Sequence, residues 1–293
     1  MKRAAFGHIG FPILLLIPQL AIIAIFFYWP AAYAVQSSFY LQDPFGFTSA
    51  YVGFDNYARL TRSTNYINAA RFTLIFTVLV TFFSLALALL LAVKADKVIR
   101  GAKTYRTLLM WVYAVAPPVA GLMGVMLFDQ GNGNITALLE RFGWDFTVGV
   151  NYWDTAIAMM VVSVWKQIPV NFIFFLSGLQ AIPRSVREAA MIDNRSGTAR
   201  FWQITFPLLA PTGFFLLIIN ITYSLFDTFG IIDTLVRGEP GNNPLTLVYR
   251  VFVDGFRGGD LGGSSAQSVV LMILVLILTI VQFRFLERRI HYT

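Results

Sequence analysis

Cysteine is absent from this chain of 293 residues, and histidine occurs only twice. Without cysteine, neither a disulfide framework nor a thiolate metal site is available. The two histidines, His8 and His291, lie near opposite ends of the chain, which leaves no histidine cluster for a metal. Charge is also scarce, at 13% of the residues, whereas soluble domains are about one quarter charged. We therefore expect no metal site and no ordinary soluble domain.

Sequence signatures of nucleotide binding and catalysis are missing as well. No G-x-x-x-x-G-K-[ST] stretch occurs, so the chain has no phosphate-cradling loop and is not expected to bind ATP by itself. Neither H-E-x-x-H nor G-x-S-x-G is present, which removes the usual parts of metal-dependent and serine-type hydrolysis. The sequence thus predicts no catalytic residue and no cofactor on this chain, and it disfavours an intramembrane enzyme.

What the chain has in abundance is apolar sequence. Hydrophobic residues make up 57% of it, and the mean hydropathy is +0.67. So much apolar surface needs lipid as its solvent, which predicts an all-α polytopic membrane protein forming one domain over residues 1–293. Six apolar runs are each near the roughly 20 residues that a bilayer requires. We place these transmembrane helices at about 9–35, 72–93, 107–128, 153–179, 211–235 and 266–286.

The distribution of positive charge predicts the orientation in the membrane. Fourteen Lys and Arg residues lie on the side that holds both termini and the loop over 180–210, against seven on the other side. The positive-inside rule then places both termini and the 180–210 loop in the cytoplasm. We accordingly attribute the net charge of +7 to the residues that set the orientation in the membrane, and we expect no nucleic-acid partner.

The 180–210 loop is the longest polar segment between two spans. The pattern predicts a first helix from Pro183 to Asp193, which ends where Asn194 adopts a left-handed conformation. A second helix is predicted from about Thr198 to Phe206, with Pro207 stopping it. A helix-turn-helix held outside the membrane between two spans indicates a platform for another protein.

The spacing within this loop carries a resemblance to a known family. Glu188-Ala189-Ala190, three residues, Asn194, nine residues, Ile204, one residue and Phe206-Pro207 resembles the EAA signature of binding-protein-dependent ABC importer permeases, E-A-A-x3-G-x9-I-x-L-P. Asn194 stands where glycine is usual and Phe206 where leucine is usual, and asparagine tolerates a left-handed turn. The resemblance implies a coupling helix that docks in a cleft of an ATPase subunit. Its candidate docking residues are Arg187, Glu188, Ala189, Ala190, Asp193, Asn194, Gly197, Ile204 and Pro207.

Helical spacing supports the same role for this segment. Val186, Ala189, Ala190 and Asp193 lie three to four residues apart, which predicts one small-residue face for a close partner. Arg187 and Glu188 are expected to make charged contacts at its rim. The alternative is a solvated amphipathic connector without a partner.

Other stretches extend the resemblance along nearly the whole chain. Asp43-Pro44-Phe45-Gly46-Phe47 is similar to the first outside loop of carbohydrate-type permeases. Ser163-Val164-Trp165-Lys166-Gln167 and Phe226-Asp227-Thr228-Phe229 are similar to permeases of the sn-glycerol-3-phosphate importer type. The resemblance implies import of sn-glycerol-3-phosphate or a related glycerophosphodiester across the bacterial cytoplasmic membrane, with a sugar or an oligosaccharide as the alternative. It also implies a second homologous permease, two ATPase subunits that hold ATP and Mg, and a periplasmic or lipid-anchored substrate-binding protein.

Polar residues inside two spans are candidates for the translocation pathway, because such residues are costly in lipid and usually face the bundle or water. Lys166 lies near mid-depth of the fourth span, and a cation there would suit a phosphate-bearing substrate. The alternative for Lys166 is a structural role, pairing with a carboxylate or capping carbonyls of a broken helix. Asn220, Tyr223 and Asp227 are spaced to share one face of the fifth span, either lining the pathway or packing helices. The full candidate set is Lys166, Gln167, Asn171, Asn220, Tyr223 and Asp227.

Two rival functions remain at this stage. An ion- or proton-coupled secondary transporter could use Asp227 and Lys166, but it leaves the spacing from Glu188 to Pro207 unexplained. An intramembrane enzyme would need a catalytic set that the sequence does not offer. We expect an ATP-driven importer permease with no covalent chemistry on this chain.

Overall fold

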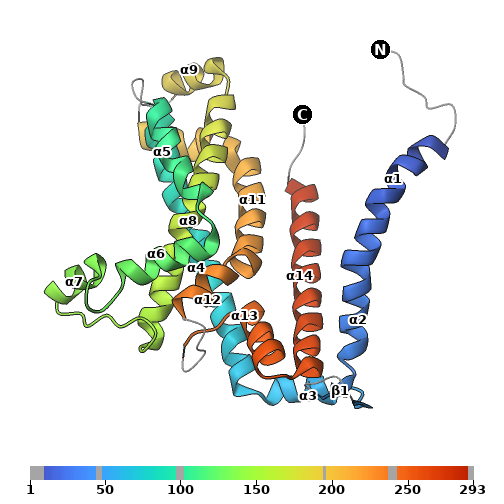
Figure 1. Cartoon of the computed structure of the whole chain (residues 1–293). Coiled ribbons are helices and arrows are strands. Elements are labelled where there is room, and N and C mark those ends of the chain that lie inside the picture. Colours follow the sequence, from blue (N-terminus) through green and yellow to red (C-terminus); the bar gives the residue numbers. More distant parts are fainter. Residues whose placement is uncertain (1–9, 44–47, 97–101, 194–195, 237–242, 290–293) are drawn as a thin grey trace. The chain divides into compact units, whose positions relative to one another are not determined.

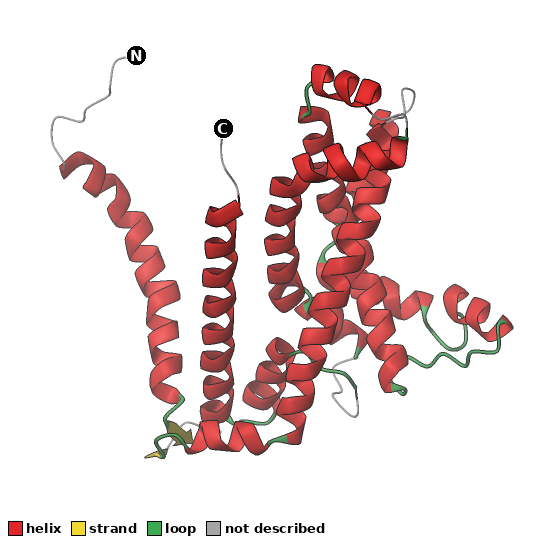
Figure 2. Ribbon diagram, turned by 180° about the vertical axis from the view of Figure 1, so that it is seen from behind, coloured by secondary structure: helices red, strands yellow, loops and turns green. Residues whose placement is uncertain are grey.

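The computed structural model describes residues 10–43, 48–96, 102–193, 196–236 and 243–289. Helices dominate these residues, and the one sheet among them is a short antiparallel pair of strands (Figure 2). Five helices are long and apolar enough to cross a membrane, and a bent helix pair passes the same test when taken together. The prediction of an all-α polytopic membrane protein is confirmed.

The chain forms two compact units, residues 1–64 with 251–275 and residues 65–250 with 276–293. In the first unit, α1, η1 and α2 form one continuous apolar helix, in which η1 is a π-helical turn. The elements of this unit are α1 (Gly10–Ile23), η1 (Ala24–Tyr28), α2 (Trp29–Ser37), β1 (Tyr40–Gln42), β2 (Ser49–Tyr51), α3 (Asp55–Arg62), η4 (Val253–Arg257) and the first part of α14 (Leu261–Arg289).

A buried amide holds the first unit together. The Asn56 side chain is fully buried and donates hydrogen bonds to the backbone carbonyls of Ser38 (2.7 Å) and Tyr40 (3.0 Å). The start of α14 comes so close that a Cβ on Gly262 would stand 2.1 Å from the Tyr40 carbonyl oxygen. Only glycine fits at that position.

The second unit contains most of the helices (Figure 1). Its core joins α4, α8 and α11 through buried side chains that include Ala88, Phe172 and Leu216. The elements are α4 (Thr64–Asp96), α5 (Ala102–Ala114), α6 (Pro117–Leu127), α7 (Asn134–Arg141), α8 (Tyr152–Ala181), α9 (Arg184–Asp193), α10 (Gly197–Arg200), η2 (Phe201–Thr205), α11 (Phe206–Thr222), η3 (Tyr223–Asp227), α12 (Phe229–Leu235) and α13 (Leu247–Phe252).

The predicted span over 107–128 is a broken helix, which corrects the expectation of one straight crossing. Its two halves, α5 and α6, meet at 101°. Pro117 and Pro118 stand at the break, and Ala116 before them is extended, with φ −63° and ψ 145°. A residue before proline is pushed out of the helical region, and proline itself has no N–H to donate. Two consecutive prolines therefore end α5 and start α6 in a new direction.

Close glycine contacts fix α6 against α12. A Cβ on Gly121 would lie 2.8 Å from Thr234 Cβ, and a Cβ on Gly230 would lie 2.8 Å from Pro118 Cγ. Glycine at both positions lets the two backbones approach closely, as is common where helices pack in membranes. The break in the span is thus held by packing as well as by proline.

Two other predictions about the helices were wrong. Pro207 does not stop a helix, because α10, η2, α11 and η3 run on from Gly197 to Asp227 as one 31-residue span. The π-helical turn η2 precedes Pro207, and in it Phe206 donates to the carbonyl of Phe201, five residues back. The wider turn accommodates the missing proline donor. The span predicted at 211–235 accordingly begins and ends earlier, at Gly197 and Asp227, and α12 follows it as a separate short helix.

Candidate functional site

The polar segment between two spans folds as predicted at its first helix. α9 begins at Arg184, directly after Pro183, whose carbonyl accepts hydrogen bonds from the backbone N–H groups of Val186 and Arg187. The second helix begins at Gly197, where the Ser196 hydroxyl caps it by accepting from the N–H of Ala199 at 3.5 Å. Asp193 is the last residue of α9, and the predicted turn residue Asn194 lies outside the described residues.

α9 has an exposed face that differs from the one predicted. Ser185, Glu188, Ala189 and Ile192 are exposed and lie three or four residues apart, which places them on one side of the helix. Ile192 is 85% exposed, which is unusual for a large aliphatic side chain. The carboxylate of Glu188 lies on the same side of the helix. Ala190, by contrast, is only 6% exposed. Within the small-residue face expected from Val186, Ala189, Ala190 and Asp193, Ala189 is therefore exposed while Ala190 is buried.

The inner side of α9 lines a cavity of about 300 Å³. The α4 and α8 ends and the η2 segment form the other walls. Four of the predicted docking residues, Arg187, Ala190, Gly197 and Ile204, line this cavity. Arg187, Ala190 and Ile204 are at least partly buried there, whereas Gly197 at the edge of the cavity and Glu188, Ala189 and Pro207 are exposed.

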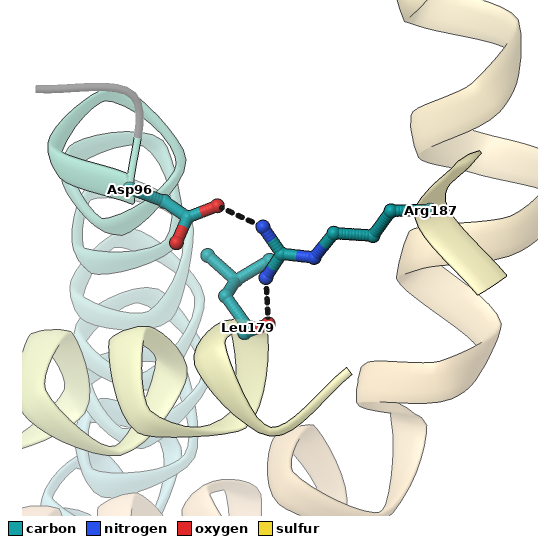
Figure 3. A network of polar contacts seen from close by, with 3 residues as sticks. All are labelled: Asp96, Leu179 and Arg187. Atoms are coloured by element: carbon teal, nitrogen blue, oxygen red, sulfur yellow. Dashed lines mark hydrogen bonds and ion pairs between the residues drawn. The ribbon is translucent and has the colours of Figure 1, made fainter. Parts of the chain in front are cut away.

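Arg187 makes contacts inside its own chain instead of at the rim of the exposed face, as Figure 3 shows. One guanidinium nitrogen lies 3.0 Å from Asp96 Oδ2 at the end of α4. Another donates a hydrogen bond to the carbonyl oxygen of Leu179, near the end of α8. A single side chain therefore connects α9 with two transmembrane helices.

The buried Lys166 also bonds within the chain. Its ammonium donates to the Tyr113 carbonyl at 3.1 Å and lies 5.3 Å from the centre of the Tyr113 ring. In a regular helix that carbonyl would accept from residue 117, which is proline and has no N–H. Lys166, 7% exposed, thus occupies the place of the missing donor at the α5–α6 break. This arrangement matches the structural alternative for Lys166, the capping of a carbonyl left by a broken helix.

Asn171 and Asn220 form a reciprocal amide pair between α8 and α11. The two hydrogen bonds measure 2.9 and 2.7 Å, and both side chains are fully buried. Ser84 of α4 adds a third bond to the Asn220 amide oxygen at 2.7 Å, and the Asn220 nitrogen also donates to the Leu216 carbonyl. A network in which the buried polar groups bond to one another holds the helices together. The geometry favours helix packing for this pair.

The three residues predicted to share one face, Asn220, Tyr223 and Asp227, differ in their exposure. Asn220 and Tyr223 are buried, and Tyr223 donates to the Ser163 carbonyl at 3.1 Å, while Asp227 is exposed. Tyr223 and Asp227 are the first and last residues of the π-helical turn η3. Gln167, the remaining candidate, is buried in α8.

Several residues at these sites were not singled out from the sequence. Tyr113 could have been found, because it lies four residues before Pro117, and Ile192 could have been found from its helical spacing to Glu188 and Ala189. Ser84 and Asp96 carry no comparable signal, since their partners lie 136 and 91 residues away. Among the described residues, no group of three or more His, Cys, Asp and Glu could hold a metal ion; His8 and His291 lie outside them.

Taken together, the fold and the site define a multi-span membrane subunit that presents an exposed helical face between two spans. Residues 70–292 match the family described as the inner membrane component of binding-protein-dependent transport systems, and the chain belongs to this family. The predicted resemblance to importer permeases is thereby confirmed, as is the prediction of a multi-pass membrane protein.

Curated relatives match the chain over its whole length. The sn-glycerol-3-phosphate transport system permease protein UgpA of Rhizobium meliloti is 48% identical, with all of both chains covered. The protein of the same name from Brucella suis is 47% identical, again with both chains fully covered, and that from Salmonella typhi is 45% identical over 99% of each chain. These relatives are named as transport permeases, in agreement with the expectation that this chain is a transport subunit and not an enzyme.

Solved structures show the same fold. A bacterial ABC transporter involved in the import of the acidic polysaccharide alginate has a TM-score of 0.82 with this chain at 19% identity, and the likeness covers 96% of each chain. A second structure of the alginate transporter, in complex with an alginate pentasaccharide-bound periplasmic protein, also has a TM-score of 0.82. At this level of identity the likeness concerns the fold.

Proposed function

We propose that this chain passes sn-glycerol-3-phosphate, or a related glycerophosphodiester, through the cytoplasmic membrane as one permease subunit of an ATP-driven importer. The observation that carries the proposal is the identity of 45–48% to sn-glycerol-3-phosphate permeases over 99–100% of the chain. Identity at this level over nearly the full length of both chains supports a shared transport role.

The proposed complex contains a second homologous permease, two ATPase subunits and a periplasmic or lipid-anchored binding protein that delivers the substrate. ATP and Mg would bind on the ATPase subunits, because this chain lacks the phosphate-cradling loop. The excess of positive charge on the side of the termini and of α9 supports a cytoplasmic position for both. α9 then faces the compartment that contains ATP.

The exposed face of α9 is the proposed docking surface for an ATPase subunit. Ile192 supplies an apolar contact near the end of α9, and Glu188 supplies charge on the preceding turn. Closure of the ATPases on ATP would move α9, and the spans would alternate between outward-open and inward-open states. A co-purification experiment tests the contact: an ATPase partner should be retained by the wild type and lost or uncoupled in Glu188→Arg. Uptake that survives this change with the ATPase deleted would support the secondary transporter instead.

The residues proposed to line the pathway are Lys166, Gln167 and Asp227, with Tyr223 beside them. Asp227 is exposed, and its negative charge attracts the Lys166 ammonium, although no direct ion pair joins them among the described residues. Asn171 and Asn220 are proposed to hold α8 and α11 together. Unchanged uptake kinetics in a well-folded Lys166→Gln variant would remove Lys166 from the pathway.

The substrate is tested with the reconstituted importer. Binding proteins loaded with glycerol-3-phosphate, a glycerophosphodiester or an oligosaccharide are added separately, and ATPase stimulation is measured. We expect stimulation by the phosphate-bearing ligands, whereas stimulation by the sugar-loaded protein alone would overturn the substrate assignment.

A further inference from the structure

We propose that Arg187 is a positioning residue that locks α9 to the ends of α4 and α8, so that a displacement of α9 is passed to both helices. The inference rests on the proposed function of α9 as the docking helix. It concerns contacts inside this chain, and it assigns Arg187 a role different from binding the ATPase.

The carbonyl of Leu179 explains why a cation is needed at this place. In a continuing helix it would accept a hydrogen bond from residue 183, but residue 183 is proline and cannot donate. The N–H of Ile182 reaches the same oxygen only at 3.3 Å. Arg187 donates to this oxygen from the first turns of α9. The proline that separates α8 from α9 therefore also creates the acceptor that ties them together.

The guanidinium group suits a connection among three helices. Its donors lie in one plane and point in fixed directions, so one nitrogen meets Asp96 of α4 while another meets Leu179 of α8. Lysine carries one compact ammonium on a flexible stem and does not hold two acceptors in such a fixed arrangement. The connection should therefore depend on arginine specifically.

The surroundings of Arg187 indicate that it positions α9 and contributes little to the stability of the fold. Its side chain is 37% exposed, and ion pairs at such exposure contribute little to folding. The cavity of about 300 Å³ beneath α9 also leaves this helix loosely packed on the rest of the unit. Since α4, α8 and α11 share one buried core, a shift applied at the ends of α4 and α8 is carried into the spans.

The first test measures whether α9 and α4 move as one body. The chain has no cysteine, so Arg184→Cys and Lys94→Cys introduce its only two thiols, both at exposed positions outside the contact. Spin labels at these sites give a distance distribution in the assembled importer, without nucleotide and with ATP trapped by vanadate. We expect a narrow distribution whose maximum does not shift between the two states, and a broad one when Arg187→Gln is added. A shift in the otherwise unchanged protein, or a narrow distribution in Arg187→Gln, would overturn the proposal.

The second test measures coupling. Arg187→Gln and Asp96→Asn should retain assembly and basal ATPase activity but lose ~10-fold of the stimulation by a glycerol-3-phosphate-loaded binding protein. Arg187→Lys should not restore it, and the double variant Asp96→Arg with Arg187→Glu should restore it only in part, because glutamate cannot donate to Leu179. Lys94→Gln, near the same end of α4, is the matched control and should keep full stimulation. Full stimulation in Arg187→Gln would contradict the role.

The two tests separate this inference from the proposed function. The distance measurement needs only nucleotide, so it reports on Arg187 even where glycerol-3-phosphate gives no stimulation of the unchanged importer. In that case the substrate assignment fails while the distance result still decides the role of Arg187.

Discussion

The middle of α8 and the segment that follows it use polar residues in opposite ways. Around Asn171 and Lys166, buried groups meet partners on other helices, and the bonds among Ser84, Asn171 and Asn220 leave no accessible polar face. In α9 the charged Arg187 turns inward, while the outward face combines a carboxylate with the exposed Ile192. The polar side chains of Asn171 and its partners therefore mark helix packing, and exposed apolar surface in the connecting helix marks the expected partner contact.

Burial explains the difference between the two regions. An unpaired polar group inside a span has no water to bond with, so its partner must come from the protein. A polar group in α9 has water available, and losing its partner costs far less. Substitutions in the two regions should consequently separate effects on folding from effects on coupling, and we rank five of them by expected effect on stability.

The largest effect on stability is expected for Asn220→Leu. This change leaves the Asn171 amide without its partner, at a cost of about 1–3 kcal/mol for a buried group left unpaired. The Ser84 hydroxyl loses one acceptor but keeps the Thr81 carbonyl at 3.2 Å. The free energy of unfolding in mixed micelles measures this cost. The double variant Asn171→Leu with Asn220→Leu should lose less than the sum of the single variants, because both amides are then removed. Additive losses would show that the pair does not act as a unit.

Lys166→Met should follow, with a loss of about 1–3 kcal/mol from the unpaired Tyr113 carbonyl, partly offset because a buried charge is removed. The same unfolding experiment measures the loss, and spin labels on α5 and α6 report whether the angle between them changes. Lys94→Met is the matched control, since Lys94 is exposed. Equal stability of the two variants would contradict a capping role for Lys166.

Gly124→Ala and Gly197→Ala form a pair that contrasts the two regions directly. A Cβ on Gly124 would lie 2.7 Å from Val162 Cγ2, so alanine there should destabilise by ~1–3 kcal/mol through overpacking. On Gly197 the nearest atom is an Arg200 guanidinium nitrogen at 3.8 Å, and alanine should be neutral or gain up to ~1 kcal/mol from helix propensity. The melting temperatures of the two variants, measured by thermal unfolding, test this contrast. A clear loss of stability in Gly197→Ala would mean that the cavity beside Gly197 has no room for a methyl group.

Ile192→Asp should change stability least, by less than ~0.5 kcal/mol, because the side chain is exposed. Coupling to the ATPase subunit should nevertheless weaken. The substitution replaces an apolar contact with a carboxylate, which would have to be dehydrated when the ATPase subunit binds. Co-purification with the ATPase measures this, and Ile192→Leu should retain the partner. A fully retained partner in Ile192→Asp would remove Ile192 from the docking surface.

The fold could be predicted from the sequence to a large extent. Runs of apolar residues located four spans directly, because their length against the bilayer thickness is a local property, whereas the span predicted at 211–235 lies at Gly197–Asp227. The break at Pro117 was missed, although two consecutive prolines signal it. Pro207 was misjudged in the other direction, since the π-helical turn that accommodates it depends on the register of a long span.

The candidate site was less accessible to prediction. Spacing identified the position of α9, yet the side of the helix that faces outward depends on where Asp96 and Leu179 lie, and these residues are 91 and eight positions away from Arg187. The same holds for Asn220, whose pairing with Asn171 joins residues 49 positions apart. Residue type and helical period indicate that such groups need partners. They do not say which partners the tertiary structure supplies.

Two of the prolines in this chain have a consequence for protein engineering. Pro117 and Pro183 each remove the backbone donor that a continuing helix would give to one carbonyl, and a cation, Lys166 or Arg187, donates to that carbonyl. Lys166 lies far from Pro117 in the sequence, whereas Arg187 lies close to Pro183 but binds the distant Asp96 as well. A chimeric permease that receives a foreign 102–127 segment should therefore also receive the residue at position 166 from the same donor. A chimera that receives a foreign 183–193 segment should retain an aspartate at position 96.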